Sequence, residues 1–288
     1  GMQSILYDII SMLRATHGYD ALLILGVSGC MFMPALRLFT HGKRLVVNID
    51  GLEHRRNKWG RLARWMLRES EARAVRHADA IVADNKGIQD YVTETYGIHS
   101  ELIAYGGDHV LREMTREKQD AVLRHYGLQR GEYAAAVCRI EPENNCHVVL
   151  EAAARSGRPL LFVGNWDHCD YARELRQKYS GVSQIHIVEA VYDIETLYAL
   201  RANAGIYVHG HSAGGTSPSL VEAMWLGSPV AAFDVVYNRE TTQGAAAYWR
   251  DVDELTALMA GDKEADWQTI GTQMEAIAQR EYNWRRIA

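Results

Sequence analysis

The stretch Ile206-Tyr-Val-His-Gly-His-Ser-Ala-Gly-Gly-Thr-Ser-Pro-Ser-Leu-Val-Glu-Ala-Met224 decides the fold, because in it a β-rich run breaks at glycines and restarts as a helix. Ser217 suits the N-cap of that helix and Pro218 suits its first position. The free backbone N–H groups and the positive end of the helix dipole then face the loop 214–216, which is a ready site for phosphate. One turn further in, Glu222 offers a carboxylate that can accept hydrogen bonds from sugar hydroxyls. Together these features predict a nucleotide-sugar site.

The same stretch resembles the donor-site signature of glycosyltransferase family 4, which has the GT-B fold. In that family two glutamates flank seven residues, and counting back from Glu222 places the first of them at Gly214. The chain thus keeps only the second glutamate, which in the family holds the nucleotide ribose. It most resembles the rhamnosyltransferase-like branch of capsule and surface-polysaccharide clusters, through His-Gly-His-x-x-Gly-Gly-Thr-x-Pro-Ser-Leu-x-Glu-Ala.

Composition excludes several classes of protein. The chain has 288 residues, of which 48% are hydrophobic, which is enough for an ample core in two domains. Its formal net charge of −5 argues against bulk nucleic-acid binding, so we expect no nucleic-acid partner. No apolar run could span a bilayer, and no cleavable signal is recognisable at the start. The four cysteines show neither metal-ligand spacing nor the density of a disulfide scaffold, which indicates reduced thiols and a cytoplasmic protein.

Strand and helix patterns alternate along the chain, which is typical of an α/β fold with parallel sheets covered on both faces. Helices are expected at residues 5–13, 59–77, 88–96 and 262–282. Strands are expected at residues 21–27, 44–50, 80–84, 101–105, 134–139, 160–164, 185–191, 205–209 and 229–234. A polar segment at 108–129 separates two sets of strands. We predict a GT-B-like fold with two Rossmann-type α/β domains, residues 1–110 and 111–288, whose sheets face a cleft.

The resemblance covers nearly the whole chain except its beginning. Family members start with a strand and a glycine-rich loop that faces the donor phosphate and the acceptor, whereas this chain opens on the helix around residues 5–13. We therefore expect a truncated first domain, either in a shortened homologue or from an internal start. On this basis the chain should bind donor but transfer sugar poorly, because the acceptor hydroxyl must be held at attack distance.

Residues at the carboxyl ends of the strands form the candidate donor site, since ligands bind there in open α/β sheets. Arg139 lies in Cys-Arg-Ile-Glu-Pro-Glu-Asn-Asn, which is similar to the family motif in which an arginine and, five residues on, a lysine hold the donor diphosphate. Here Asn144 takes the lysine position, so a charge-assisted contact worth about 1.5–3 kcal/mol is lost and loop amides must replace it. The candidate substrate-binding residues are Asn165, Val191, Tyr192, His209, His211, Gly214, Gly215, Thr216, Glu222 and Arg239.

Plainer interpretations of these residues remain open. A lone arginine at a strand end is usually a surface residue, and Glu222 could be a solvated helix residue or a cap partner. His209 and His211 share one face of a strand, as a metal pair would, but a third ligand at usable spacing is missing. We therefore expect no metal, and for the two histidines sugar contact and simple packing both remain.

The first domain offers a group of acids and a histidine just past a strand, in Asn48-Ile-Asp-Gly-Leu-Glu-His54. Asp50, Glu53 and His54 are the catalytic candidates on this side, because such groups near a sugar hydroxyl can orient it or take its proton. Asp-Gly is also a common turn pair, so a plain turn is the alternative.

Basic residues crowd the region from Arg55 to Arg76, beside Trp59 and Trp65. A basic amphipathic helix can rest on an anionic membrane surface, which predicts peripheral contact at the inner face of the membrane. A solvated charged face explains the pattern equally well.

The resemblance implies a glycosyltransferase that moves a sugar, rhamnose in the branch it most resembles, from a nucleoside diphosphate donor to a glycan or lipid-linked acceptor. Arg139 and the amides of residues 214–216 would stabilise the leaving diphosphate, with no cofactor. A nucleotide-sugar epimerase and a non-catalytic nucleotide-sugar binder are the alternatives. A dehydrogenase is disfavoured, because no Gly-x-Gly-x-x-Gly follows any strand.

Overall fold

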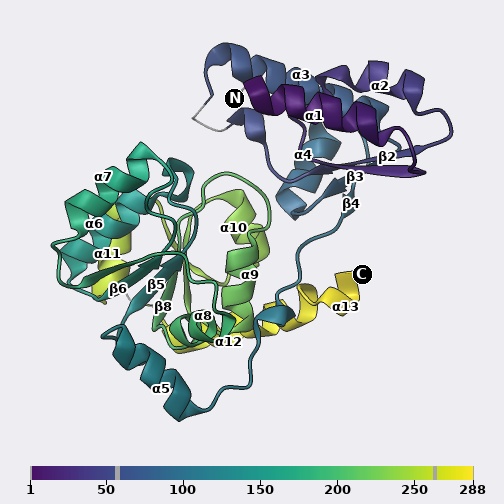
Figure 1. Ribbon diagram of the computed structural model, residues 1–288. Helices are drawn as coiled ribbons and strands as arrows, with labels where there is room; N and C mark the ends of the chain where they lie inside the picture. The colour runs from purple at the N-terminus through teal and green to yellow at the C-terminus, as the bar shows by residue number, and fades with distance from the viewer. Residues whose placement is uncertain (1, 56–58, 262–264, 288) are drawn as a thin grey trace. The chain divides into compact units, whose positions relative to one another are not determined.

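The computed structural model describes residues 2–55, 59–261 and 265–287, and shows an α/β fold with two parallel sheets (Figure 1). Contacts divide the chain into two compact units. The N-terminal unit holds residues 1–104 together with 213–216, and the C-terminal unit holds residues 105–212 and 217–288. The sequence placed the change of domain after residue 110, and the compact units change over between Ala104 and Tyr105.

The N-terminal unit is a four-stranded parallel sheet in the order β1-β2-β3-β4. On β2, Leu45, Val47 and Ile49 are fully buried, and the residues between them are partly exposed, as the alternation of a strand requires. The short helix α2 was not predicted. The helices and strands are α1 (Met2–Ala15), β1 (Ala21–Leu25), α2 (Met33–Phe39), β2 (Arg44–Ile49), α3 (Arg61–His77), β3 (Ala80–Ala83), α4 (Lys86–Tyr96) and β4 (Glu101–Leu102).

The C-terminal unit is a six-stranded parallel sheet in the order β10-β9-β8-β5-β6-β7. Strand β10 was not predicted, and the expected helix at 262–282 is present from Trp267, its residues 262–264 lying outside the described ones. The elements are α5 (Arg116–His125), β5 (Ala134–Val137), α6 (Cys146–Ser156), β6 (Leu160–Val163), α7 (Asp170–Tyr179), β7 (Ile185–Val188), α8 (Ile194–Ala202), β8 (Ile206–His209), α9 (Pro218–Trp225), β9 (Val230–Phe233), α10 (Val236–Thr241), β10 (Ala247–Trp249), α11 (Val252–Ala260), α12 (Trp267–Glu281) and α13 (Trp284–Ile287).

Helices cover both faces of this second sheet (Figure 1). Along β5, Ala134 and Ala136 belong to the core formed with α6, α7 and α11. Tyr133 and Ala135 belong to the opposite core, formed with α5, α8 and α9. The central strand is therefore buried on both faces, which explains its continuous apolar run and leaves only its ends to meet a ligand.

Two glycines at the start of the C-terminal unit lie against aromatic side chains. A Cβ atom on Gly106 would lie 2.6 Å from Cγ of Trp284, and one on Gly107 would lie 2.6 Å from Cδ1 of Trp225. The Gly107 amide donates to the carbonyl of Tyr282 at 2.8 Å. The segment is thus packed too closely for any side chain. In the described part of the chain, no helix has the length and apolarity needed to cross a membrane.

Candidate functional site

The candidate donor site lies at the carboxyl edge of the C-terminal sheet, where β5 and β8 are neighbours. The chain runs outward from β5 through β6 and β7 and then returns to the other side of β5 as β8. The sheet reverses its winding direction between these two strands, and ligands of open α/β sheets bind at such switch points. Arg139 follows β5 and His211 follows β8, so two predicted residues lie at this position.

Hydrogen bonds join the loops that follow these two strands. The side-chain amide of Asn144 donates to the carbonyl of Arg139 at 2.7 Å, and its oxygen lies 2.6 Å from Nδ1 of His211. Because that oxygen can only accept, Nδ1 of His211 carries the hydrogen. Ser212 donates its amide to the carbonyl of Glu143 at 2.9 Å. Asn144 is 5% exposed, so the residue at the family's lysine position joins the two loops instead of reaching solvent.

The guanidinium of Arg139 is open to solvent. Its side chain is 69% exposed, and Nη1 lies 3.6 Å from Oε1 of Glu141. An exposed pair at that distance contributes little and holds the side chain weakly. Arg139 is therefore available to bind an anion at the switch point.

His209 is buried at the end of β8 between two other rings. Its centroid lies 6.4 Å from that of Tyr207, with the rings nearly parallel, and 6.0 Å from that of His211. Burial, and to a smaller extent the positive groups of His211 and Arg201, together lower the pKa of His209 to about 3. Its Nε2 is buried and has no partner among the described residues. His209 is neutral at ordinary pH and cannot supply a cation to a ligand.

Glu222 on α9 is held from two sides inside the C-terminal unit. Nη1 of Arg201, on α8, donates to its Oε2, and Nε2 of His109 lies 3.1 Å from its Oε1. Nε1 of Trp284 donates to Nδ1 of His109, so Nε2 of that histidine carries the hydrogen that Glu222 accepts. Arg201 is 1% exposed and also donates to the carbonyl of Ser219 at 2.6 Å. Glu222 is thus oriented before any ligand binds.

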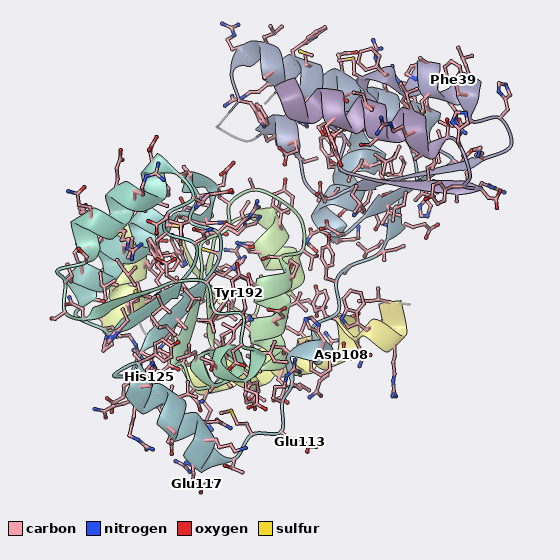
Figure 2. All side chains as sticks on the ribbon, in the orientation of Figure 1. Phe39, Asp108, Glu113, Glu117, His125 and Tyr192 are labelled. Carbon is pink, nitrogen blue, oxygen red and sulfur yellow. The ribbon has the colours of Figure 1, made fainter. Side chains whose placement is uncertain are left out.

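The structure does not bring the other donor-side candidates into this set of contacts. Arg239 pairs with Asp234, and its guanidinium lies 4.0 Å from the centre of the Tyr248 ring. Tyr192, after β7, is 88% exposed (Figure 2). Asn165 is exposed and accepts a hydrogen bond from the amide of Asp167, whereas Val191 packs against the core beneath β7.

The glycine loop before α9 groups with the N-terminal unit. Gly214 has a φ of 141°, which favours glycine, and a Cβ atom on Gly215 would lie 1.8 Å from Oδ1 of Asp84. Thr216 is buried and donates its hydroxyl to the carbonyl of Asp84. As predicted, Ser217 is the N-cap of α9 and proline occupies its first turn, but the Ser217 hydroxyl makes no cap hydrogen bond.

The catalytic candidates of the N-terminal unit follow β2 and differ in their surroundings. Asp50 is exposed, and Glu53 accepts a hydrogen bond from Nε1 of Trp59 at 3.4 Å. His54 is mostly buried, and its Nδ1 lies 3.1 Å from Oε2 of Glu71 on α3. His54 is thus held by a fully buried partner.

Sequence reasoning missed Asp84, the residue that follows β3. Ile49 pairs with Ala83 in the sheet, so Asp50 and Asp84 stand at adjacent strand ends. Burial and, to a smaller extent, the nearby charge of Asp50 together raise the pKa of Asp84 to about 7. The strand-end rule that we applied to the second domain would have found it. Arg201 and Glu71 gave no such signal, because charged residues on helices are ordinarily exposed.

The possible metal ligands and the cysteines of the described residues were compared with what metal or thiol chemistry requires. The described residues contain no group of three His, Cys, Asp or Glu side chains placed to hold a metal. Sγ of Cys138 lies 4.0 Å from Sγ of Cys146, and both thiols are free. The hydrogen bond between them, together with burial, raises the pKa of Cys138 well above its ordinary value, so this thiol is not a ready nucleophile.

Two family models match the chain, one in each half. Residues 3–108 match the family described as Domain of unknown function (DUF1972), and residues 120–253 match Glycosyl transferases group 1. The second match contains Arg139, Asn144, His211 and Glu222, so these residues lie in a segment similar to that family. Comparison with curated protein sequences gives no match.

Solved structures of glycosyltransferases share the fold. The Anabaena protein Alr3699/HepE in complex with UDP-glucose is similar with a TM-score of 0.79 at 15% identity, over 97% of this chain and 79% of that one. Sucrose-phosphate synthase from Thermosynechococcus elongatus gives 0.76 at 18% identity, over 96% and 73%. The pneumococcal O-GlcNAc transferase GtfA in complex with UDP and GlcNAc gives 0.68 at 13% identity, over 96% and 57%. The predicted GT-B-like α/β fold with two parallel sheets is confirmed.

Proposed function

We propose that this chain transfers a sugar from a nucleoside diphosphate donor to a glycan or lipid-linked acceptor. The match of residues 120–253 to Glycosyl transferases group 1 supports sugar transfer, and similar structures were determined with UDP or a UDP-sugar. Rhamnose as the sugar, and surface polysaccharide as the product, follow from the resemblance of residues 209–223 to the rhamnosyltransferase-like branch.

One observation carries this proposal: Arg139 and the loop containing His211 lie together at the switch point of the sheet, inside the matched domain. An exposed guanidinium suits a diphosphate, because it can donate two hydrogen bonds in parallel. In the proposed reaction it stabilises the charge that develops on the leaving diphosphate. The step needs no metal in this scheme.

Glu222 would hold the ribose of the donor nucleotide. Each of its oxygens already has a protein partner, but each carboxylate oxygen has a second lone pair and can accept a further hydrogen bond. Because Arg201 and His109 fix the carboxylate, a ribose hydroxyl would meet an acceptor that has little freedom left to lose.

The N-terminal unit would rest on the inner face of a membrane through α3. Arg61, Trp65 and Arg68 are exposed at positions one helical turn apart, beside exposed Leu62. Basic and aromatic side chains on one face are the composition of an interfacial helix. Of the rest of the basic region, Arg56 and Lys58 lie outside the described residues, and Arg73 donates to the carbonyl of Met31. A lipid-linked acceptor and a cytoplasmic location agree with such contact.

Calorimetric titration with nucleoside diphosphates and their sugars tests the donor site. One base should bind in preference to the others, and Arg139→Ala should weaken that binding about tenfold, equivalent to ~1.4 kcal/mol. Arg155→Ala is the matched control, because Arg155 is an exposed arginine at the other end of α6, paired with Asp253. Equal affinities for the wild type and Arg139→Ala would contradict the assignment. Conversion of the donor sugar without any acceptor would indicate an epimerase, and binding without turnover a non-catalytic protein.

A further inference from the structure

Three asparagine side chains hold the loop that follows β8. Nδ2 of Asn145 donates to the carbonyl of Gly210 at 2.9 Å, and Nδ2 of Asn238, on α10, donates to the carbonyl of His211 at 2.9 Å. The third is Asn144, whose side-chain oxygen lies 2.6 Å from Nδ1 of His211. A Cβ atom on Gly210 would lie 2.2 Å from the carbonyl oxygen of Asn144, so the two loops meet backbone against backbone. Both the main chain and the ring of His211 are therefore fixed before any ligand binds.

The hydrogen bond to Asn144 decides where His211 can take up a proton. An amide oxygen only accepts, so Nδ1 of His211 already carries a hydrogen and a further proton must go to Nε2. The amide of Asn144 is held in this sense, because its Nδ2 donates to the carbonyl of Arg139 at 2.7 Å. The His211 ring is partly exposed, so solvent can supply the proton. A second proton would make the ring an imidazolium with Nε2–H as its remaining donor.

The charged surroundings of His211 favour this ring as the place for a proton. The acidic, basic and histidine residues on the elements that hold it are Arg139, Glu141, Glu143, His209, Asp234, Arg239 and Glu240. On α10, Arg239 pairs with Asp234. Burial, with smaller contributions from His211 and Arg201, lowers the pKa of His209 to about 3, so His209 stays neutral. Of the two histidines, His211 is thus the one that takes up a proton.

We propose that His211 binds the donor diphosphate as an imidazolium and replaces the cation that a lysine supplies in the resembling family. The diphosphate of a nucleotide sugar carries two negative charges, and the exposed guanidinium of Arg139 balances one of them. On binding, His211 takes up a proton from solvent at Nε2, and Nε2–H donates a hydrogen bond to a phosphate oxygen. It thereby adds to the stabilisation that Arg139 gives the leaving diphosphate. The inference rests on the proposed function, whose donor it concerns.

Asparagine at position 144 suits this arrangement better than lysine. A lysine side chain has donors and no acceptor, so it could not receive the hydrogen of Nδ1 and fix the ring of His211. Asn144 is 5% exposed, so a cation there would also lose its water. The positive charge has in effect moved from the loop after β5 to the loop after β8, which lies beside it.

Nuclear magnetic resonance on protein labelled with ¹⁵N-histidine tests the proton without any sugar transfer. The signal of His211 is assigned by its loss in His211→Gln. Inorganic pyrophosphate at a saturating concentration should move the titration midpoint of His211 to higher pH by about one unit, because a nearby anion favours the charged ring. His125 is the internal control, because it is exposed at the end of α5, and the amino end of β5 follows that helix. Its midpoint should not move.

Calorimetry with a nucleoside diphosphate sugar tests the role of His211 in binding. This probe lacks the terminal phosphate proton that titrates near about pH 6, so its own charge stays constant. The imidazolium is present at low pH and is lost as pH rises through the midpoint of the complex, so wild-type affinity should fall about fivefold between about pH 6 and 8. His211→Gln should bind about fivefold more weakly than the wild type at the lower pH and almost equally at the higher one. His125→Gln is the matched control and should behave as the wild type.

A fixed charge separates this role from a structural one. His211→Lys should bind with little pH dependence and, near about pH 8, more tightly than His211→Gln, which a purely structural loss would not produce. Heats of binding in buffers of different ionisation enthalpy count protons. Near about pH 7 the wild type should take up roughly half a proton per donor molecule, and His211→Gln should take up none. Circular dichroism shows that each variant is folded.

The outcomes distinguish this inference from the proposed function. A His211 midpoint that pyrophosphate leaves unmoved would overturn the inference, and so would a His211→Gln variant with the pH dependence of the wild type, even if the protein transfers sugar well. A protein that shows the expected proton uptake and transfers no sugar from any donor would refute the proposed function instead, and His211 would still be a residue that binds diphosphate.

Discussion

One helical glutamate in each unit lies at a candidate site, and the two are held by different kinds of partner. Glu71 in the N-terminal unit is fully buried, and in the described part of the chain its hydrogen-bond donors are two tyrosine hydroxyls and an imidazole. Glu222 in the C-terminal unit faces a buried arginine and accepts a second hydrogen bond from His109. The described donors to the first carboxylate are two hydroxyls and an imidazole, whereas the second carboxylate pairs with a buried guanidinium.

The difference determines what each glutamate can do. Glu71 accepts a hydrogen bond from Nδ1 of His54 and so fixes the orientation of that ring. Glu222 cannot be removed without leaving the charge of Arg201 buried and unpaired, so it stabilises its unit as well as offering a carboxylate to a ligand. A loss of ligand binding on replacing Glu222 would therefore combine a lost ligand contact with a loss of stability.

The largest effect should come from Glu222→Ala. We expect it to lower the free energy of unfolding of the C-terminal unit by about 3 kcal/mol, because it strands a buried cation. Urea unfolding followed by hydrogen exchange of peptides from each unit measures this. The double replacement Arg201→Met with Glu222→Leu should recover most of the loss, since buried pairs can be exchanged for apolar ones. If Glu222→Ala alone were as stable as the wild type, Arg201 would have to find another partner.

Glu71→Leu should cost less, about 2 kcal/mol, and only in the N-terminal unit. It leaves two hydroxyls and an imidazole without their acceptor, but Tyr91 and Tyr96 are only partly buried and can turn toward water. Glu71→Gln, which keeps an acceptor oxygen, should cost about half as much. Hydrogen exchange of peptides from each unit measures this as well. Equal destabilisation of both units would contradict the view that the contacts of Glu71 and those of Glu222 stabilise their units independently.

Acid should affect the C-terminal unit before the N-terminal one. His209 is neutral when folded, with a pKa of about 3, and takes up a proton near pH 6.5 when unfolded. Its contribution is complete above pH 6.5 and falls by at most about 1.4 kcal/mol per pH unit below it. Glu71 has a lowered pKa, so its contribution is complete above about pH 4.5 and is lost below that value.

Thermal unfolding between pH 4 and 8 checks this order. His209→Phe, which keeps a ring between Tyr207 and His211, should flatten the loss between pH 6.5 and 4.5 and leave the loss below pH 4.5 unchanged. An unchanged slope in that variant would mean that another group takes up the proton.

Asn144→Lys should weaken binding of the nucleoside diphosphate, although it restores the lysine of the resembling family. We expect about a fivefold loss, equivalent to ~1 kcal/mol, because the replacement breaks the bonds to Arg139 and His211 that join the two loops. Titration calorimetry of this variant and of Asn144→Ala separates the effect of the added charge from the effect of the lost hydrogen bonds. Tighter binding by the lysine variant would show that the hydrogen bonds of Asn144 contribute little to the site.

The smallest expected effect concerns the membrane and only the N-terminal unit. Arg68→Gln should weaken co-sedimentation with anionic vesicles by up to about fivefold, in line with ~1 kcal/mol for one basic residue at the surface. Added salt should reduce the binding of both proteins. Vesicles of neutral lipid are the control, and equal binding to them would remove the electrostatic argument.

The sequence was sufficient for most of the fold, because strong periodic patterns set the elements. Every strand that we predicted is present, ending between one and three residues earlier than expected in all cases but β8. Strand β10 escaped prediction because its three residues are too few for a pattern. The helix α2 is only seven residues long and begins with Met33-Pro34, a signal that is easily read as a turn.

The sequence could predict the candidate-site residues at the ends of strands, but not the hydrogen bonds that connect the loops. Arg139 and His211 follow directly from the rule that ligands meet the carboxyl edge of the sheet. The hydrogen bond between Asn144 and His211 joins positions 67 residues apart, and no local sequence pattern indicates it. Arg201 and Glu71 look like solvated helix residues in sequence, and only the packing of whole helices buries them.

The glycine pair at the start of the C-terminal unit has a consequence for reading variation among related chains. Gly106 and Gly107 should tolerate almost no substitution, since every side chain would meet Trp284 or Trp225. A survey of tolerated mutations would mark them as strongly as the glycines of a phosphate loop. Their intolerance would nevertheless report on aromatic packing around the entering chain, so a glycine that resists mutation is not by itself a ligand-binding glycine in this protein.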